Sequence, residues 1–257
     1  MTANLRLERD GPVARLLLDR PDKRNAIEQA MWEELPTLID AAMDDPAVRL
    51  LIVGSARPGM FCAGADIGEF AERSGDPAWR SRNQAAIRRT QVTLAHAPKP
   101  TIAAVDGDCV GAGCGLALAC DLRLASPRAR FGITPAKLGL VYPLHDTKLL
   151  VDAVGPAQAK RILFTAGLLD AAEAHRIGLV DILSEDLAAA VDELAAAIVA
   201  VSPHSQRASK AIVRQILEGA TDDDDASTGQ FDSAFEGGDF REGVAAFLAK
   251  RKPVFGA

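Results

Sequence analysis

The sequence predicts an α/β body followed by a helical tail. Over the first two thirds of the 257 residues, short apolar runs alternate with segments of helical period, and after Gly155-Pro156 the helical period dominates. Hydrophobic residues make up 48% of the chain, which is enough for one large core. We therefore expect a body at residues 1–190 and a tail at residues 191–257.

Four short apolar runs in the body predict strands, because each begins directly after a proline or a charged residue and is too short for a helix. These runs are Val13–Leu18, Leu50–Val53, Thr101–Val105 and Leu122–Ala125.

Helical spacing of apolar residues predicts helices at Glu28–Met43 and Asn83–Leu94, with residues 73–82 as a solvated loop. Pro36 lies inside the first of these helices. Because proline has no backbone N–H, we expect a kink or a restart at this position.

The tail contains three further segments of helical period, Leu187–Val201, Ser205–Leu217 and Asp239–Lys250. Between the last two lies Asp222–Asp225, which predicts a solvated turn or a helix N-terminus. The tail helices are apolar on one face, so they must cover either their own core or a neighbouring subunit.

Charge and composition argue against several classes of function. The net charge of −6 is the opposite of the basic surface that nucleic-acid binding requires. No apolar run approaches the roughly 18 residues of a membrane span, and charged residues interrupt the N-terminus where a signal peptide would be apolar. The four cysteines form no CxxC pair and have no histidine nearby in sequence, so we expect buried free thiols, no metal site and a cytoplasmic setting.

Two glycine-containing segments, Phe61–Ile67 and Gly107–Leu116, predict a site built from backbone N–H groups. Glycine allows a tight turn in the first segment, and in the second it allows a ligand to approach the main chain at the start of a helix. Two such donors aimed at one point would form an oxyanion hole, which contributes about 3–4 kcal/mol per donor in a transition state.

Two other interpretations of the second segment remain. A dinucleotide-binding loop would need glycine or alanine at position 116, where Leu116 stands, and would normally follow the first strand of the chain. A glycine-rich helix that packs closely on a strand would serve structure alone.

The order of the motifs resembles the crotonase superfamily, also called the enoyl-CoA hydratase/isomerase family, almost from end to end. The segments that carry this resemblance are Arg20–Ala26, Phe61–Ile67, Ile102–Gly107, Gly111–Gly113, Ala119–Asp121, Phe131-Gly132, Leu138–Leu140, Val154-Gly155, Gly178–Val180, Arg241–Val244 and Lys250–Pro253. Each motif is weakly specific, but their order and spacing together are strongly specific.

The resemblance implies a spiral of ββα units with a helical C-terminal tail, assembled as a homotrimer or a homohexamer. It implies an acyl-CoA thioester as the substrate, with coenzyme A as part of that substrate and no separate cofactor. The thioester carbonyl would lie between the N–H groups of Ala65 and Ala112.

The resemblance also implies contacts with coenzyme A. The adenine would rest against the backbone of Ala63, Asp66 and Ile67, and the segment with Lys23, Arg24 and Ala26 would follow the phosphates. Phe247 and Lys250 would reach the coenzyme A of a neighbouring subunit. Two alternatives stay open: the lysines are ordinary solvated charges, and Asp66 is a turn-forming residue at a helix N-terminus.

Both glutamates that family hydratases use are missing from their expected positions, which are Gly115 and Pro135. Hydration needs one group to activate water and another to protonate the α-carbon, and neither residue can titrate. The segment Val141–Thr147 contains His145 and Asp146, and the hypothesis is that one of them supplies the missing base. The alternative is a surface loop with turn-forming polar residues.

Two classes of function follow. The first is an enzyme acting on an acyl-CoA through an oxyanion, in a hydratase/isomerase-like reaction, a decarboxylation or a thioester hydrolysis. The second is a non-catalytic acyl-CoA binder that keeps the fold. A weaker third interpretation needs a nucleophile beside the oxyanion hole, for which Cys114 and Asp146 are the options.

Overall fold

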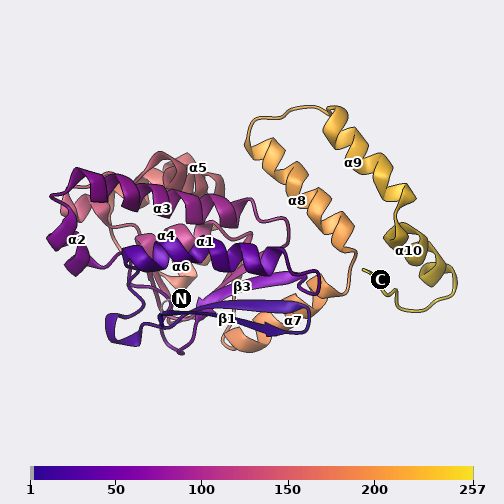
Figure 1. Cartoon of the computed structure of the whole chain (residues 1–257), viewed down its shortest axis with the longest axis horizontal. Helices are drawn as coiled ribbons and strands as arrows, with labels where there is room; N and C mark the ends of the chain where they lie inside the picture. The colour runs from indigo at the N-terminus through magenta and orange to yellow at the C-terminus, as the bar shows by residue number, and fades with distance from the viewer. Residues whose placement is uncertain (1–2, 257) are drawn as a thin grey trace.

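The computed structural model describes residues 3–256 and contains two β-sheets flanked by helices (Figure 1). The larger sheet has the strand order β1-β2-β3-β4-β6-β9, with only β1 antiparallel to its neighbour. Its strands are β1 (Leu5–Asp10), β2 (Val13–Leu18), β3 (Leu50–Ser55), β4 (Thr101–Val105), β6 (Leu122–Ala125) and β9 (Ile182–Leu183).

The smaller sheet has the order β5-β7-β8, in which β5 pairs parallel and β8 antiparallel with β7. These strands are β5 (Asp108–Val110), β7 (Arg130–Gly132) and β8 (Leu169–Asp170). The sheet matters for the site because β5 lies in the second glycine-containing segment.

The larger sheet is buried on both faces, because successive side chains of a strand point to opposite sides. Leu51 and Val53 of β3 belong to the main core, under the helices α1 (Gln29–Met43) and α3 (Pro77–Ala95). Leu50 and Ile52 face the other way and pack against α7 (Leu187–Val199). The expected boundary at residue 190 therefore falls inside a helix that packs on the body.

The helix α1 continues through Pro36, so the expected restart is wrong. In a regular helix the N–H of residue 36 would donate to the carbonyl of Trp32. In its place the Thr90 hydroxyl of α3 donates to the Trp32 carbonyl at 2.9 Å. A side chain of the neighbouring helix thus replaces the backbone donor that proline lacks.

Three further differences concern element boundaries. The expected loop at residues 73–82 is wrong, because α2 (Ile67–Arg73) and α3 meet there and Asp76 caps α3 ahead of Pro77. The expected loop Val141–Thr147 is wrong from residue 144 onward, because α5 (Leu144–Thr165) begins there. Strand β1 was not predicted because only Leu5 and Leu7 are apolar along this edge of the sheet.

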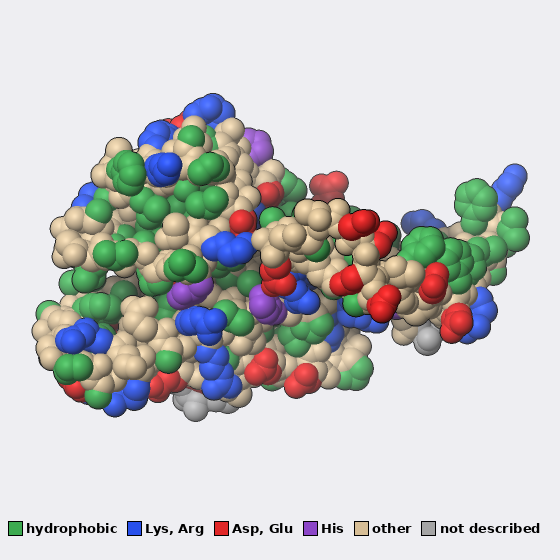
Figure 2. Space-filling model, turned by 90° about the horizontal axis from the view of Figure 1, so that it is seen from above, with side chains coloured by type: hydrophobic (Ala, Val, Ile, Leu, Met, Phe, Trp, Pro, Cys, Tyr) green, Lys and Arg blue, Asp and Glu red, His purple; other side chains and the backbone are tan. Residues whose placement is uncertain are grey.

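The tail consists of α8 (Pro203–Leu217), α9 (Asp225–Glu236) and α10 (Gly238–Leu248), and it projects from the body (Figures 1 and 2). Asp224 caps α9 and forms a capping box with Ser227, so the acidic run marks a helix N-terminus, one of the two expected outcomes. Many large apolar side chains on these helices are exposed: Ile212, Val213, Ile216, Leu217, Phe231, Phe235, Phe240, Val244, Phe247 and Leu248.

No single helix among residues 3–256 is long and apolar enough to cross a membrane, and only α7 and α8, bent by 104° at their junction, meet those criteria as a pair.

Candidate active site

The two glycine-containing segments are joined directly by main-chain hydrogen bonds. The N–H of Cys62 donates to the carbonyl of Asp108 at 2.8 Å, and the N–H of Val110 donates to the carbonyl of Cys62 at 3.0 Å. Segments that lie about 45 residues apart in the chain therefore run side by side, and they bring the two expected oxyanion donors to the same region.

Glycine is required where the segments meet. A Cβ added to Gly113 would lie 2.7 Å from the carbonyl oxygen of Cys62, which is closer than atoms of this kind can approach. Gly64 has φ +110°, a conformation that side chains disfavour, and its Cβ would lie 3.1 Å from the Val110 carbonyl. The close packing that was an alternative interpretation of the second segment is therefore present.

The N–H groups of Ala65 and Ala112 have no acceptor among the described residues. Ala65 lies in a short parallel bridge with Ile27, where its neighbours Gly64 and Asp66 take part in the two hydrogen bonds and leave its own N–H unused. Ala112 is the first residue of α4 (Ala112–Leu118), so its N–H has no partner within the helix. Both groups are therefore available to a ligand oxygen.

The segment expected to follow the coenzyme A phosphates lies beside the first donor. The carbonyl of Arg24 accepts from the N–H of Ala63 at 3.0 Å, and Arg20 holds the carbonyl of Ala26 at 3.0 Å. The side chains of Lys23 and Arg24 are exposed. The fold thus brings Lys23, Arg24, Ala26, Ala63, Asp66 and Ile67 together around Ala65.

Asn25 holds this segment in place and was not singled out from the sequence. Its side chain is fully buried, accepts from the N–H of Arg20, and donates to the Ser55 hydroxyl and the Phe61 carbonyl. Asn25 also adopts a positive φ of 56°, a conformation in which asparagine is enriched. Its place in Arg20–Ala26 was the only signal in the sequence.

The side chain of Asp66 caps α2, as one of the two sequence alternatives has it. Its carboxylate accepts from the N–H groups of Gly68 and Glu69 and pairs with Arg20 at 2.7 Å. Burial raises the pKa of Asp66, but the bond from Arg20 and the capping N–H groups outweigh this and leave the pKa below its ordinary value. The side chain of Asp66 is thus occupied by structural contacts.

Three helices converge at Gly115, one of the two positions where a glutamate is missing. A Cβ on Gly115 would lie 2.8 Å from Oδ1 of Asp146 and 3.3 Å from the hydroxyl of Tyr142, and closer still to the amide nitrogen of Gln91. Gln91 comes from α3 and Asp146 from the first turn of α5. A carboxylate from α5 thus occupies the space beside α4 that is left open by the absent side chain.

Asp146 and His145 are in contact, although adjacent residues usually point apart. Nε2 of His145 lies 3.1 Å from Oδ2 of Asp146, and the Asp146 side chain is almost completely buried. Burial raises the pKa of Asp146, while the bond from Gln91 and the charge of His145 oppose this in part. A buried carboxyl group of this kind is suited to exchanging a proton.

An apolar cavity of about 290 Å³ lies beside this cluster, and Tyr142 is part of its wall. Pro135, the second position of a missing glutamate, is another part of the wall. The remaining lining residues are Ile133, Ala136, Leu140, Val141, Thr147 and Leu163. Figure 2 shows a hollow with hydrophobic walls at the end of the molecule away from the tail.

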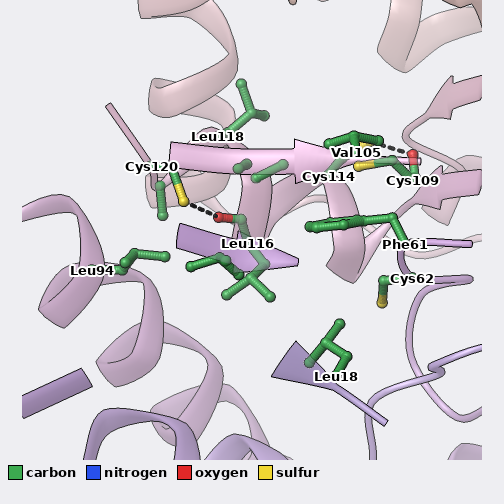
Figure 3. Close-up of a cluster of buried hydrophobic side chains, with 14 of the residues drawn as sticks. Leu18, Phe61, Cys62, Leu94, Val105, Cys109, Cys114, Leu116, Leu118 and Cys120 are labelled. Atoms are coloured by element: carbon green, nitrogen blue, oxygen red, sulfur yellow. Dashed lines mark hydrogen bonds between the residues drawn. The ribbon is translucent and has the colours of Figure 1, made fainter. Parts of the chain in front are cut away.

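The cysteines near the glycine segments are buried free thiols (Figure 3). The thiol of Cys114 donates to the carbonyl of Cys109 at 2.8 Å and lies 3.3 Å from that of Gly132. Burial raises the pKa of Cys62 to about 12 and that of Cys109 well above its ordinary value. Because the Cys114 thiol is buried and bonded to main-chain carbonyls, the structure gives no support to Cys114 as a nucleophile.

Residues 8–257 match the family model described as enoyl-CoA hydratase/isomerase. The chain belongs to the enoyl-CoA hydratase/isomerase family. It is 37% identical to a crotonyl-CoA hydratase of Syntrophomonas wolfei, with 98% of this chain and 97% of that protein covered. It is 34% identical to the 2,3-dehydroadipyl-CoA hydratase of Escherichia coli, with 98% of each covered.

Solved structures of this family confirm the expected crotonase fold. A putative enoyl-CoA hydratase/isomerase family protein from Hyphomonas neptunium has a TM-score of 0.96 at 40% identity, over 99% of this chain and 98% of that one. An enoyl-CoA hydratase/carnithine racemase from Magnetospirillum magneticum has a TM-score of 0.94 at 33% identity, over 99% and 96% of the two chains. As a member of the enoyl-CoA hydratase/isomerase family, the chain is an enzyme of acyl-CoA chemistry.

Two of the expected coenzyme A residues do not reach this site within one chain. Phe247 and Lys250 are exposed on and just after α10, which lies at the opposite end of the molecule from α2 (Figure 1). The site of this enoyl-CoA hydratase/isomerase family member is otherwise assembled from α2, α3, α4, α5 and the segments before them.

Proposed function

We propose that this protein moves a proton on an acyl-CoA thioester whose carbonyl oxygen accepts hydrogen bonds from Ala65 and Ala112, with Asp146 as the acid–base group. The observation that carries the proposal is the position of the Asp146 carboxylate against Gly115, where the family resemblance expects a glutamate. The carboxyl group belongs to α5 and not to α4, but it lies against Gly115 of α4.

The reaction that this arrangement supports best is a shift of a carbon–carbon double bond. Two N–H groups stabilise the enolate oxygen that forms when the α-carbon of the acyl group loses a proton. One carboxyl group can remove that proton and return it to another carbon, whereas hydration also needs a group that activates water. Pro135 supplies no such group on its side of the cavity.

Hydration is the second candidate because of one observation, the 3.1 Å contact between His145 and Asp146. In that reaction His145 would activate water and Asp146 would protonate the α-carbon. The side chain of His145 is 23% exposed, although its Nε2 is buried against Asp146.

The acyl part of the substrate is uncharged and apolar in this proposal. The cavity beside Tyr142 is lined almost entirely by aliphatic groups and contains no cation that could pair with a second carboxylate. Burying an unpaired charge there would be costly.

Coenzyme A lies along Lys23, Arg24 and Ala26 and against the backbone of Ala63, Asp66 and Ile67. The proximity of these residues to Ala65 supports this part of the proposal. A neighbouring subunit contributes Phe247 and Lys250, and the exposed apolar face of the tail supports a homotrimer or homohexamer. The four free thiols favour a cytoplasmic setting.

A panel of thioesters tests the function: 3-enoyl-CoA, crotonyl-CoA and a malonyl-type ester. We expect turnover of 3-enoyl-CoA, and we expect Asp146→Asn to lower kcat by about 10²–10⁴-fold with binding retained. Asp152→Asn is the matched control, because this carboxylate lies on the same helix and pairs with Lys148. Full activity of Asp146→Asn would contradict the proposed role, and binding without turnover of any ester by the wild type would indicate a non-catalytic acyl-CoA binder.

A further inference from the structure

We propose that Gln91 is the positioning residue of this site: it fixes the Asp146 carboxylate through an amide hydrogen bond, in the space that Gly115 leaves open. This inference rests on the proposed function of Asp146 and adds a third helix to the machinery. Neither Gln91 nor its helix was expected from the sequence to take part in the chemistry.

The hydrogen bond between the side chains of Gln91 and Asp146 is short and buried. Nε2 of Gln91 donates to Oδ1 of Asp146 at 2.5 Å, and the two residues are 1% and 3% exposed. A hydrogen bond to a carboxylate strengthens when water is excluded, because the local dielectric constant is low. The bond therefore holds one oxygen of Asp146 in a fixed place and leaves Oδ2 toward His145.

Gly115 is the structural condition for this pair. Any side chain at position 115 would collide with Gln91 and Asp146, because its first atom would already lie 2.8 Å from Oδ1. The Gln91–Asp146 pair and a glutamate on α4 thus exclude each other sterically. The absence of a glutamate at position 115 and the buried amide of Gln91 therefore depend on each other.

Gln91 is poorly satisfied as a residue that only fills the core. Its carbonyl oxygen Oε1 is buried and has no hydrogen-bond partner among the described residues. An amide kept for packing alone would cost less free energy as an aliphatic side chain, since an unpaired buried polar atom is unfavourable. The donor end is the part of Gln91 that the site uses.

Two titratable groups face Asp146 and affect its pKa. They are His145 on α5 and Tyr142 just before α5, while α3 contributes the neutral Gln91. Because the Gln91 bond stabilises the ionised form, loss of the bond should raise the pKa of Asp146 further. The acid limb of the kcat/KM profile would then move to higher pH.

The test compares Gln91→Met with Asn83→Leu. Asn83 is a buried amide two turns earlier on α3 that donates to Gln29 at 2.7 Å, so its loss mimics the structural cost alone. For Gln91→Met we expect kcat to fall by up to about 10-fold and KM to stay within about two-fold of the wild-type value. We expect the acid limb of the kcat/KM profile to move to higher pH by about half a pH unit or more. For Asn83→Leu we expect a lower Tm and an unmoved acid limb.

Gln91→Glu keeps the shape of the side chain if the methionine variant folds poorly. Two carboxyl groups in contact must share a proton at neutral pH, so this variant should also raise the acid limb. A wild-type pH profile and kcat in both Gln91 variants would overturn the inference. An equal shift in Asn83→Leu would overturn it too. Full activity of Asp146→Asn, in contrast, would reject the proposed function itself.

Discussion

At the scale of single residues, the site depends on where side chains are absent. Gly113 lets α4 approach Cys62, and Gly115 makes room for Gln91 and Asp146. The two glycines have different consequences. A side chain at position 113 would separate the two segments that carry the proposed oxyanion donors, while one at position 115 would displace the Asp146 carboxyl group.

The first prediction concerns Gly115→Ala. The added methyl group would collide with Gln91 and Asp146, and overpacking of this kind typically costs about 1–3 kcal/mol. We expect lower stability in denaturant unfolding and a loss of kcat. The double variant with Gln91→Ala should recover part of the stability, because it removes the closer of the two collisions, but it should not recover the rate. Equal stability of Gly115→Ala and the wild type would contradict the packing described here.

The second prediction concerns the stability contributed by Asp146. A carboxyl group with a raised pKa in the folded state contributes stability below its unfolded pKa of about 3.9, and loses that contribution as the pH rises through the folded value. At neutral pH the buried charge therefore opposes folding. We expect Asp146→Asn to raise Tm at pH 7 while it lowers kcat, and the gain to shrink as the pH falls toward 4.

Asp108→Asn provides the comparison for that measurement. Asp108 is paired with Arg130 at 2.7 Å near the surface, so its replacement should not raise Tm at pH 7. If Tm rises for both variants, the effect comes from the change in net charge and not from the burial of Asp146.

At the scale of elements, the hydroxyl group of Thr90 joins α3 to α1 at Pro36. The Thr90 side chain donates to the carbonyl of Trp32, which Pro36 leaves without its helical partner. The same hydroxyl lies 3.0 Å from the carbonyl of Ala86 in its own helix. A proline can therefore remain inside a buried helix because the neighbouring helix supplies the missing donor.

The third prediction tests this coupling with a double-mutant cycle. Thr90→Val leaves the buried Trp32 carbonyl without a donor and should cost about 1–3 kcal/mol in denaturant unfolding. In a Pro36→Ala background the restored N–H can serve the carbonyl, so the same change should cost clearly less. Equal costs in the two backgrounds would show that the carbonyl has another partner.

At the scale of the whole molecule, the tail presents apolar residues that the rest of the chain does not cover. Phe231, Phe235 and Phe240 stack edge to face with centroids 5.2 Å apart, yet all three remain about half exposed. Large apolar side chains that are exposed together in this way are typical of a protein–protein interface. Phe247 and Lys250 lie on the same tail, so assembly and coenzyme A binding should be linked.

The fourth prediction is that Ile216→Asp on α8 yields a smaller species in sedimentation velocity and weakens binding of an acyl-CoA. Ile216 is 59% exposed, so the change should leave the fold of the single chain intact. Arg88→Asp on the exposed side of α3 is the control and should change neither property. Unchanged sedimentation of Ile216→Asp would argue against assembly through this face.

Local chemistry was enough to predict several elements. The strands Val13–Leu18, Thr101–Val105 and Leu122–Ala125 have the expected bounds, because a short, mostly apolar run between breakers favours a buried strand. Helix α9 was not predicted, since its sequence contains two serines and a glycine and its start depends on the Asp224 cap. Such a helix forms through capping and packing more than through its residue preferences.

The sequence by itself determined the family, the two glycine-containing segments and the absence of carboxylates at Gly115 and Pro135. These are properties of order and spacing, which survive without coordinates. Only the tertiary structure decided that Asp146 is buried in a helix instead of exposed in a loop, and that Gln91 reaches it from α3. That contact joins residues 55 positions apart. It depends on how three helices pack around a missing side chain, which no local pattern encodes.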